Sequence, residues 1–225
     1  MVKKADEEYE KNRAGYKAMG LVYYTREEEV WNTFSHGLGA LFGFVAAICI
    51  LVIGDKTVDV ILSAMLYALG VVAPYSISTA YHGVKDLDKK RTLRKFDHAG
   101  IALIIFGNSA PMCLLYKSGP EVYYIVAASL AICVVNIILC LVDLNKFSTV
   151  ALILDLVCAA VGVVGYVLCR YNIGWPAKIC YIVGSVLCLT GLAFYGRNKK
   201  YMHTVFHVLM VCGTAVYFGA LAVAL

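Results

Sequence analysis

The sequence predicts an all-α integral membrane protein, built as one bundle of seven transmembrane helices. Of its 225 residues, 61% are hydrophobic and only 16% are charged, a composition too apolar for a soluble domain of this size. From Phe34 onward, apolar segments of membrane-spanning length follow one another with short polar breaks. Because backbone groups in lipid need partners within the structure, segments this long and apolar indicate helices rather than barrel strands.

Each predicted helix is an apolar stretch bounded by charged or turn-forming residues. The connections are too short to hold a second domain. We therefore expect a transmembrane domain over residues 34–225. Residues 1–33 have mixed charge and no signal-peptide pattern, and are expected to form a cytoplasmic tail, part of it an interfacial helix. The seven predicted spans are Phe34–Ile53, Val58–Tyr81, Ala99–Tyr116, Val122–Val142, Ser148–Leu168, Ala177–Phe194 and Met202–Leu225.

Lysine and arginine decide the predicted orientation. The tail and the second, fourth and sixth connections carry sixteen basic residues, whereas the other connections and the C-terminus carry four. This bias places the N-terminus in the cytoplasm and the C-terminus outside, as expected for a multi-pass protein of the cell membrane. The net charge of +5 mostly reflects this anchoring pattern. Without a basic stripe interleaved with aromatic residues, it does not indicate nucleic-acid binding.

The polar residues of the predicted spans gather near the cytoplasmic side. All five histidines lie at the cytoplasmic ends of helices, and Ser78 precedes His82 by one helical turn. Asp97 opens the third span, and Asp155 lies about two turns into the fifth. Ionisable groups inside a membrane are costly and mark functional sites by default. The pattern predicts a site within the bundle that opens to the cytoplasm.

The spacing of three histidines permits a metal site. His203 and His207 are four residues apart and share one helix face, and His82 can add a third nitrogen from another helix. Three imidazoles with one open position are typical of catalytic zinc, and the absence of a thiolate from the set favours Zn²⁺ over softer metals. Water on such a metal becomes a nucleophile near neutral pH. Asp97 could orient that water or take its proton, and Ser78 could hold the water or a substrate oxygen.

Less specific interpretations of the same residues stay open. The paired histidines could hydrogen-bond to neighbouring helices or sit at the headgroup boundary. His36 and His98 are interpreted as residues that line the site or the interface rather than as ligands, and Asp155 could belong to a buried hydrogen-bond network.

Four motifs resemble those of a known family. "EEVWNTFSHGLG" (Glu28–Gly39) is similar to an E-x-x-N-x-x-[ST]-H opening of the first helix, carried here by Glu29, Asn32 and His36. "SISTAYH" (Ser76–His82) resembles its S-x-x-x-H motif, "KFDHAG" (Lys95–Gly100) its D-H-A start of the third helix, and "HTVFH" its H-x-x-x-H motif. The chain from about residue 28 onward thus resembles the bacterial haemolysin III proteins. These are related to the progestin and adipoQ receptors and to alkaline ceramidases.

The resemblance implies a zinc ion near the cytoplasmic face, held by His82, His203 and His207. It also implies that Asp97 binds the zinc water with Ser78 beside it, and that the substrate is a ceramide-like lipid of the bilayer. The expected function is a zinc-dependent hydrolase of lipid amide or ester bonds. Two alternatives stay open, namely a cytolytic or pore-forming protein and a receptor-like protein with a structural zinc.

Overall fold

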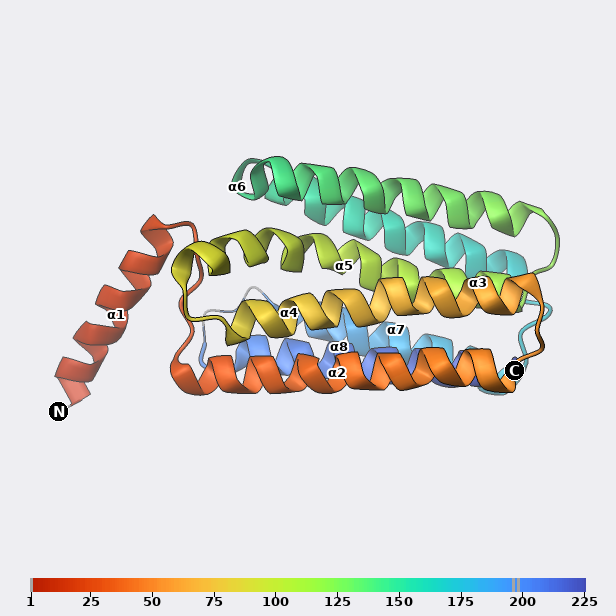
Figure 1. The fold of residues 1–225 in the computed structure, drawn as a ribbon, viewed down its shortest axis with the longest axis horizontal. Coiled ribbons are helices and arrows are strands. Elements are labelled where there is room, and N and C mark those ends of the chain that lie inside the picture. Colours follow the sequence, from red (N-terminus) through yellow and green to blue (C-terminus); the bar gives the residue numbers. More distant parts are fainter. Residues whose placement is uncertain (1, 196, 198) are drawn as a thin grey trace.

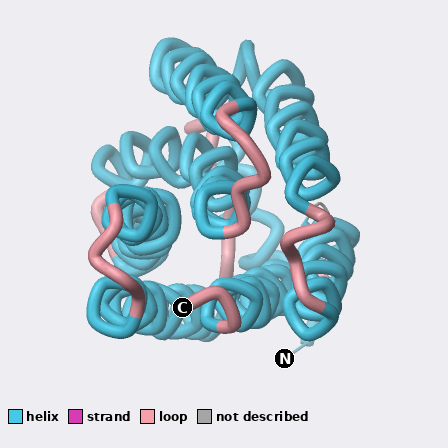
Figure 2. The backbone as a smooth tube through the Cα atoms, turned by 90° about the vertical axis from the view of Figure 1, so that its right-hand side faces the viewer, coloured by secondary structure: helices cyan, strands magenta, loops and turns pink. Residues whose placement is uncertain are grey.

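The molecule is a bundle of long helices. The computed structural model describes residues 2–195, 197 and 199–225, with side chains from Tyr9 onward, and every regular element within them is a helix (Figure 1; Figure 2). Six of these helices are long and apolar enough to cross a membrane. The predicted all-α class is confirmed, and the chain is a multi-pass membrane protein.

The bundle is formed by α2 to α8, while α1 projects from one end of it (Figure 1). One span, Val58–Gly83, is built from three consecutive elements, α3, η1 and α4. In chain order the elements are α1 (Val2–Ala18), α2 (Arg26–Ile53), α3 (Val58–Tyr67), the π-helical turn η1 (Ala68–Val72), α4 (Ala73–Gly83), α5 (Leu87–Leu115), α6 (Glu121–Cys169), α7 (Trp175–Tyr195) and α8 (Met202–Ala222).

Helix α6 has 49 residues and folds back on itself at Asp143, whose φ of −155° and ψ of 93° interrupt the helical backbone. Asn136 Nδ2 donates a hydrogen bond to the carbonyl of Ala151 over 3.0 Å, so the two arms lie side by side (Figure 1). The arms match the fourth and fifth predicted segments. The number of membrane crossings and the side of each terminus stay predictions.

Two helices begin earlier than their apolar segments predict. The amide of Glu28 donates to Thr25 Oγ1 and the Glu28 carboxylate accepts from the Thr25 amide, so a capping box starts α2 at Arg26. Asp86 is the N-cap of α5, and its side chain accepts a hydrogen bond from the amide of Lys89. Hydropathy marks only the apolar part of a helix, whereas the caps mark its start. The polar first turns of α2 and α5 are therefore helical.

The π-helical turn brings α4 close to α5. Pro74 has no N–H for the carbonyl of Gly70, four residues earlier, and a π-turn is a common response to such an interruption. At this turn a Cβ on Gly70 would lie only 2.3 Å from the Cα of Gly107 in α5. Only glycine allows this approach, which fixes the two helices against each other near the polar residues that follow.

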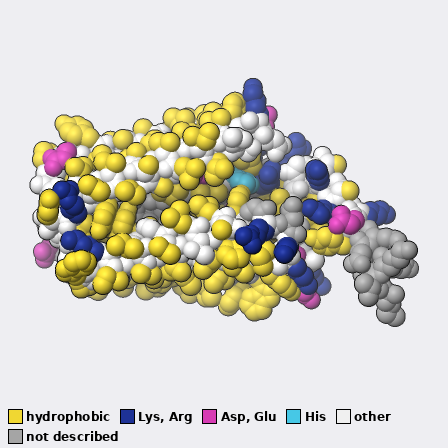
Figure 3. All heavy atoms as spheres, turned by 180° about the vertical axis from the view of Figure 1, so that it is seen from behind, with side chains coloured by type: hydrophobic (Ala, Val, Ile, Leu, Met, Phe, Trp, Pro, Cys, Tyr) yellow, Lys and Arg dark blue, Asp and Glu magenta, His cyan; other side chains and the backbone are white. Residues whose placement is uncertain are grey.

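The surface has an apolar body with charged ends. Figure 3 shows hydrophobic side chains over most of the length of the molecule, and many large apolar side chains on the outer faces of the helices are exposed. Lys and Arg side chains gather mainly at the end that bears α1 (Figure 3). This distribution suits a protein whose sides contact lipid and whose ends contact water.

Candidate metal centre

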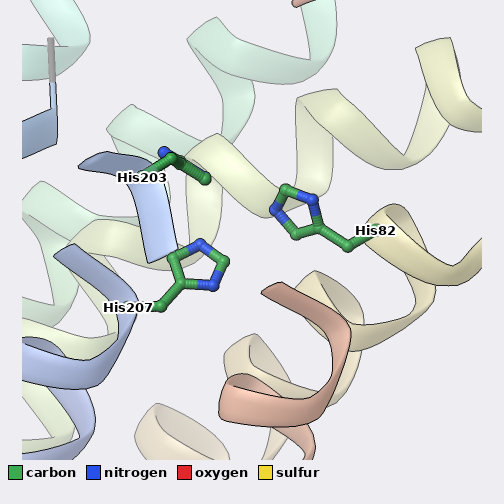
Figure 4. Close-up of side chains that lie close together, drawn as sticks. All are labelled: His82, His203 and His207. Carbon is green, nitrogen blue, oxygen red and sulfur yellow. The ribbon is translucent and has the colours of Figure 1, made fainter. Parts of the chain in front are cut away.

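Three histidine side chains converge inside the bundle near the end that bears α1. His82 comes from the last turn of α4, and His203 and His207 come from the first two turns of α8 (Figure 4). One nitrogen from each ring lies within 4.8 Å of the other two. The trio predicted from spacing is therefore close together, and it could hold a metal ion.

Two of the three histidines, His82 and His203, have buried nitrogens without a protein partner among the described residues. His82 Nε2 and both nitrogens of His203 are buried and have no hydrogen-bond partner among the described residues. A buried polar atom without a partner costs about 1–3 kcal/mol. Three neutral imidazoles with free lone pairs fit a metal ion that accepts nitrogen ligands.

His82 is oriented by a carboxylate and a buried lysine. Glu29 Oε2 lies 2.6 Å from His82 Nδ1, and Glu29 Oε1 lies 2.8 Å from Lys90 Nζ. Lys90 also donates to the carbonyl of Tyr81 over 2.9 Å, and the lysine is only 2% exposed. A carboxylate next to Nδ1 requires that nitrogen to carry the proton, so the lone pair of His82 is on Nε2, which faces the trio.

His207 is oriented by the next turns of α2. Its Nδ1 lies 3.3 Å from the carbonyl oxygen of Asn32 and 3.4 Å from Ser35 Oγ. The side chain of Asn32 accepts a hydrogen bond from Thr204 Oγ1 over 2.6 Å and so ties α2 to α8. Glu29 and Asn32 of the α2 motif thus contact α4 and α8, the two helices that carry the three histidines. The motif itself contributes no histidine to the trio.

Ser78 and Asp97 lie beside the trio. They line a cavity of about 30 Å³ together with His203 and His207, and Ser78 Oγ is buried with no hydrogen-bond partner within the described residues. A cavity of that volume has room for at least one water molecule. The structure thus places a hydroxyl, a carboxylate and two histidines of the trio around a space that a water or a substrate oxygen would fill.

The other two predicted histidines lie on different sides of the trio. The His36 ring stacks on His207 with centroids 3.5 Å apart, and it is buried, with neither nitrogen hydrogen-bonded to another described residue. His98 is directed toward α7, where its Nδ1 lies 3.1 Å from the hydroxyl of Tyr195. Neither belongs to the group that could hold a metal.

Asp155 is not part of this cluster. It accepts a hydrogen bond from Asn136 over 2.9 Å across the two arms of α6, so it belongs to the network that holds that hairpin together. It also lines a mainly apolar cavity of about 250 Å³ between α5, the second arm of α6, α7 and α8. This cavity shares Ile101, Tyr195 and Phe206 with the small cavity beside the trio.

Two residues of the site, Lys90 and Tyr24, were not predicted from the sequence. Lys90 lies within a run of basic residues that was interpreted only as an orientation signal, although it precedes Asp97 by two helical turns and shares its face of α5. Tyr24 precedes α2, and its ring stacks on His203 with centroids 4.8 Å apart. Burial raises the pKa of the Tyr24 phenol well above its usual range, so its hydroxyl stays protonated. No local pattern around Tyr24 indicated this contact.

Comparison with known proteins identifies the family. The sequence profile described as "Haemolysin-III related" matches residues 24–218. The chain is 22% identical over 195 residues to Hemolysin-3 of Bacillus cereus, an alignment that covers 85% of this chain and 89% of the relative. It is also 20% identical over 198 residues to the Hemolysin-3 homolog of Bacillus subtilis (strain 168), with 87% and 93% covered. The matched region contains every residue of the candidate site, and the chain belongs to the haemolysin-III related family.

Proposed function

We propose that this protein is a zinc-dependent membrane hydrolase that cleaves amide or ester bonds of lipids. The observation that carries the proposal is the convergence of three histidines, two of which, His203 and His207, line one small cavity together with Ser78 and Asp97. His82, His203 and His207 would hold the ion. Bound there, zinc would supply a Lewis acid that polarises a carbonyl and makes a neighbouring water more acidic.

The side chains of the protein have separate roles in this proposal. Asp97 accepts the proton of the attacking water, and Ser78 donates a hydrogen bond to the carbonyl oxygen of the substrate. Glu29 holds His82 in the tautomer that presents Nε2. The surrounding helices exclude bulk water, and exclusion of water strengthens these electrostatic interactions.

A lipid substrate is favoured by the apolar cavity next to the small one. It is large enough for an acyl segment, and its lining comes mostly from apolar side chains of four helices. Its shared wall with the small cavity, which includes Ile104 and Met210, would place a carbonyl at the end of the acyl segment beside Ser78 and Asp97. The partners implied are the lipid bilayer of the cell membrane and an acylated, ceramide-like lipid within it.

The first test is the metal content per chain of purified, chelator-washed and zinc-reloaded protein, measured by elemental analysis. We expect about one zinc per chain in the parent and none in the His203→Ala/His207→Ala variant. Asp97→Asn should keep the metal and lose hydrolysis of acyl amides, whereas Asp88→Asn, at an exposed position of the same helix, should keep both. Full hydrolysis by Asp97→Asn would contradict the role of Asp97, and a parent that binds no metal would contradict the proposal.

The name shared by both relatives favours cytolysis as a second candidate. A pore and a hydrolase respond differently to chelation, because only the hydrolase depends on the metal for its effect. Lysis of erythrocytes or vesicles that survives chelation and Asp97→Asn would support the pore. Loss of lysis in both cases would mean that lysis results from lipid products. A receptor with a structural zinc would instead keep its ligand response in Ser78→Ala, while metal removal would abolish that response.

A further inference from the structure

A third cavity opens at the end of the molecule that bears α1, and we call it the basic vestibule. It has a volume of about 400 Å³. It is enclosed by α1, the segment before α2, and residues of α4, α5, α7, α8 and the connection before α8. Asp97, Tyr195 and His203 line both the vestibule and the small cavity. The basic vestibule therefore ends at the candidate metal centre.

The charged side chains of the vestibule are mainly positive. Against two carboxylates, those of Glu28 and Asp97, the lining contains five cations: Arg13, Lys17, Arg94, Arg197 and Lys199. The Glu28 carboxylate already accepts hydrogen bonds from the Thr25 and Tyr201 amides, at 2.9 Å each. Low-dielectric walls around charges of one sign concentrate the field within a cleft. The vestibule thus favours an anion.

One cation in this lining has an unused donor. Arg94 donates through Nη1 to the Gly20 carbonyl over 2.7 Å, but its Nε is buried and has no hydrogen-bond partner in the part of the chain that the structure describes. An N–H of a guanidinium in this position needs an acceptor. A phosphate or carboxylate oxygen would supply one, and these are the groups that arginine binds best.

The basic charge is not fully explained by the orientation of the protein in the membrane. Lys85, Lys89 and Arg91 lie at the same end, are exposed, and do not line the vestibule. They already serve the positive-inside pattern. The cations of the vestibule instead surround a concave space that continues into the reaction site, so they can contact a ligand that reaches the histidines.

We infer that the vestibule binds the anionic polar part, phosphate or carboxylate, of an acylated lipid whose acyl segment occupies the apolar cavity. The inference rests on the proposed function, because the three adjoining cavities then correspond to the acyl chain, the scissile carbonyl and the polar part of one molecule. It changes the substrate class, since a ceramide is neutral and would not complement the excess positive charge of the vestibule, where only Arg13 has a carboxylate partner, Glu10, among the ion pairs of the described residues.

Binding to metal-free protein tests this inference without hydrolysis. The chelator-treated protein is placed in nanodiscs of zwitterionic phosphatidylcholine. Binding of dodecyl phosphate, dodecyl maltoside and inorganic phosphate is then measured by calorimetry. We expect dodecyl phosphate to bind at least about tenfold more tightly than the other two probes. Equal binding of the two dodecyl compounds would overturn the inference, and binding of inorganic phosphate as tight as that of dodecyl phosphate would overturn its lipid part.

A matched pair of triple variants locates the site. Lys17→Gln/Arg197→Gln/Lys199→Gln removes two lysines and one arginine from the vestibule, and Lys85→Gln/Lys89→Gln/Arg91→Gln removes the same charges from the outer surface. We expect the first variant to lose about tenfold in affinity for dodecyl phosphate and the second to stay within about twofold of the parent. An equal loss in both variants would show that surface charge alone attracts the anion, and would overturn the inference.

Hydrolysis by zinc-loaded protein separates this inference from the proposed function. The substrates are N-dodecanoylglycine, which is anionic, and N-dodecanoylethanolamine, which is neutral. Faster cleavage of the glycine conjugate than of the ethanolamine conjugate by the parent supports the inference, provided that Lys17→Gln/Arg197→Gln/Lys199→Gln loses this preference. Equal cleavage of both conjugates would leave the hydrolase standing and overturn the anionic substrate class. If neither is cleaved while metal-free protein still selects dodecyl phosphate, the anion site stands and the proposed hydrolase fails.

Discussion

Replacing the buried Lys90 by methionine tests how the candidate centre is held together. The side chain of Lys90 is 3% exposed, that of Glu29 is 18% exposed and that of His82 is 0% exposed. Lys90→Met keeps a similar length but leaves the Glu29 carboxylate without its cation. Removing one partner of a buried ion pair costs about 3–5 kcal/mol. Because Glu29 retains some access to water, we expect about 3 kcal/mol, at the lower end of this range.

The same change should weaken metal binding. Without Lys90, the Glu29 carboxylate takes up a proton or turns toward water, and His82 loses the partner that fixes its tautomer. Loss of such an outer partner typically lowers metal affinity by about 10–100-fold. Stability is measured by unfolding in mixed detergent micelles, and affinity by competition with a zinc chelator. Lys89→Met is the matched control, because Lys89 is the exposed neighbour in the same helical turn, and both quantities should stay near the parent values.

A double-mutant cycle gives the result that would refute this reasoning. Glu29→Gln combined with Lys90→Met removes both charges, so the double variant should be less destabilised than the sum of the two single variants, by about 1–3 kcal/mol. Additive effects would mean that Glu29 and Lys90 do not stabilise each other. A zinc affinity unchanged in Lys90→Met would mean that the lysine does not act on His82.

Three further predictions concern the metal, the helix contact and the hairpin. His203→Ala should abolish zinc binding in elemental analysis and lower the unfolding midpoint, because one ligand of three is lost. Gly70→Ala should destabilise the fold by about 2 kcal/mol or more in detergent unfolding, because the new Cβ would clash with the backbone of Gly107. Gly37→Ala is the control and should be tolerated, because the atom nearest to its new Cβ would be 3.7 Å away. Asn136→Ala should cost about 1–3 kcal/mol by leaving Asp155 without its donor, and Asn136→Ala/Asp155→Ala should recover part of that loss.

The fold was largely predictable because lipid leaves few alternatives to an apolar helix. The parts that could not be predicted from hydropathy depend on polar backbone contacts. The capping box at Thr25 begins α2 within the residues that were assigned to the tail. The approach of Gly70 to Gly107 depends on a π-helical turn, and the spacing of apolar residues in the sequence does not indicate such a turn. Hydropathy describes how a segment interacts with lipid, whereas these features describe how helices start and how they contact each other.

The candidate site was predictable where its residues follow a local spacing. His203 and His207 could be paired from their positions in one helix, and Ser78 and His82 from theirs. Lys90 could not be distinguished from its basic neighbours, because in a sequence a buried lysine looks like an exposed one. Its burial arises only when α5 packs against α4, where Lys90 contacts Tyr81 and its ammonium group reaches Glu29 of α2. A tertiary contact of this kind leaves no periodic signal.

The arrangement of hydrogen bonds favours a metal centre over a polar network. A network of histidines satisfies itself by pairing donors with acceptors, and the outer nitrogens of His82 and His207 are occupied in that way by Glu29 and Asn32. Those contacts fix the protons on the outer nitrogens and turn lone pairs toward His203, neither of whose nitrogens has a partner in the described part of the chain. A water molecule can donate to only two lone pairs, whereas one cation can accept all three. A metal ion is therefore the partner that would satisfy all three lone pairs at once.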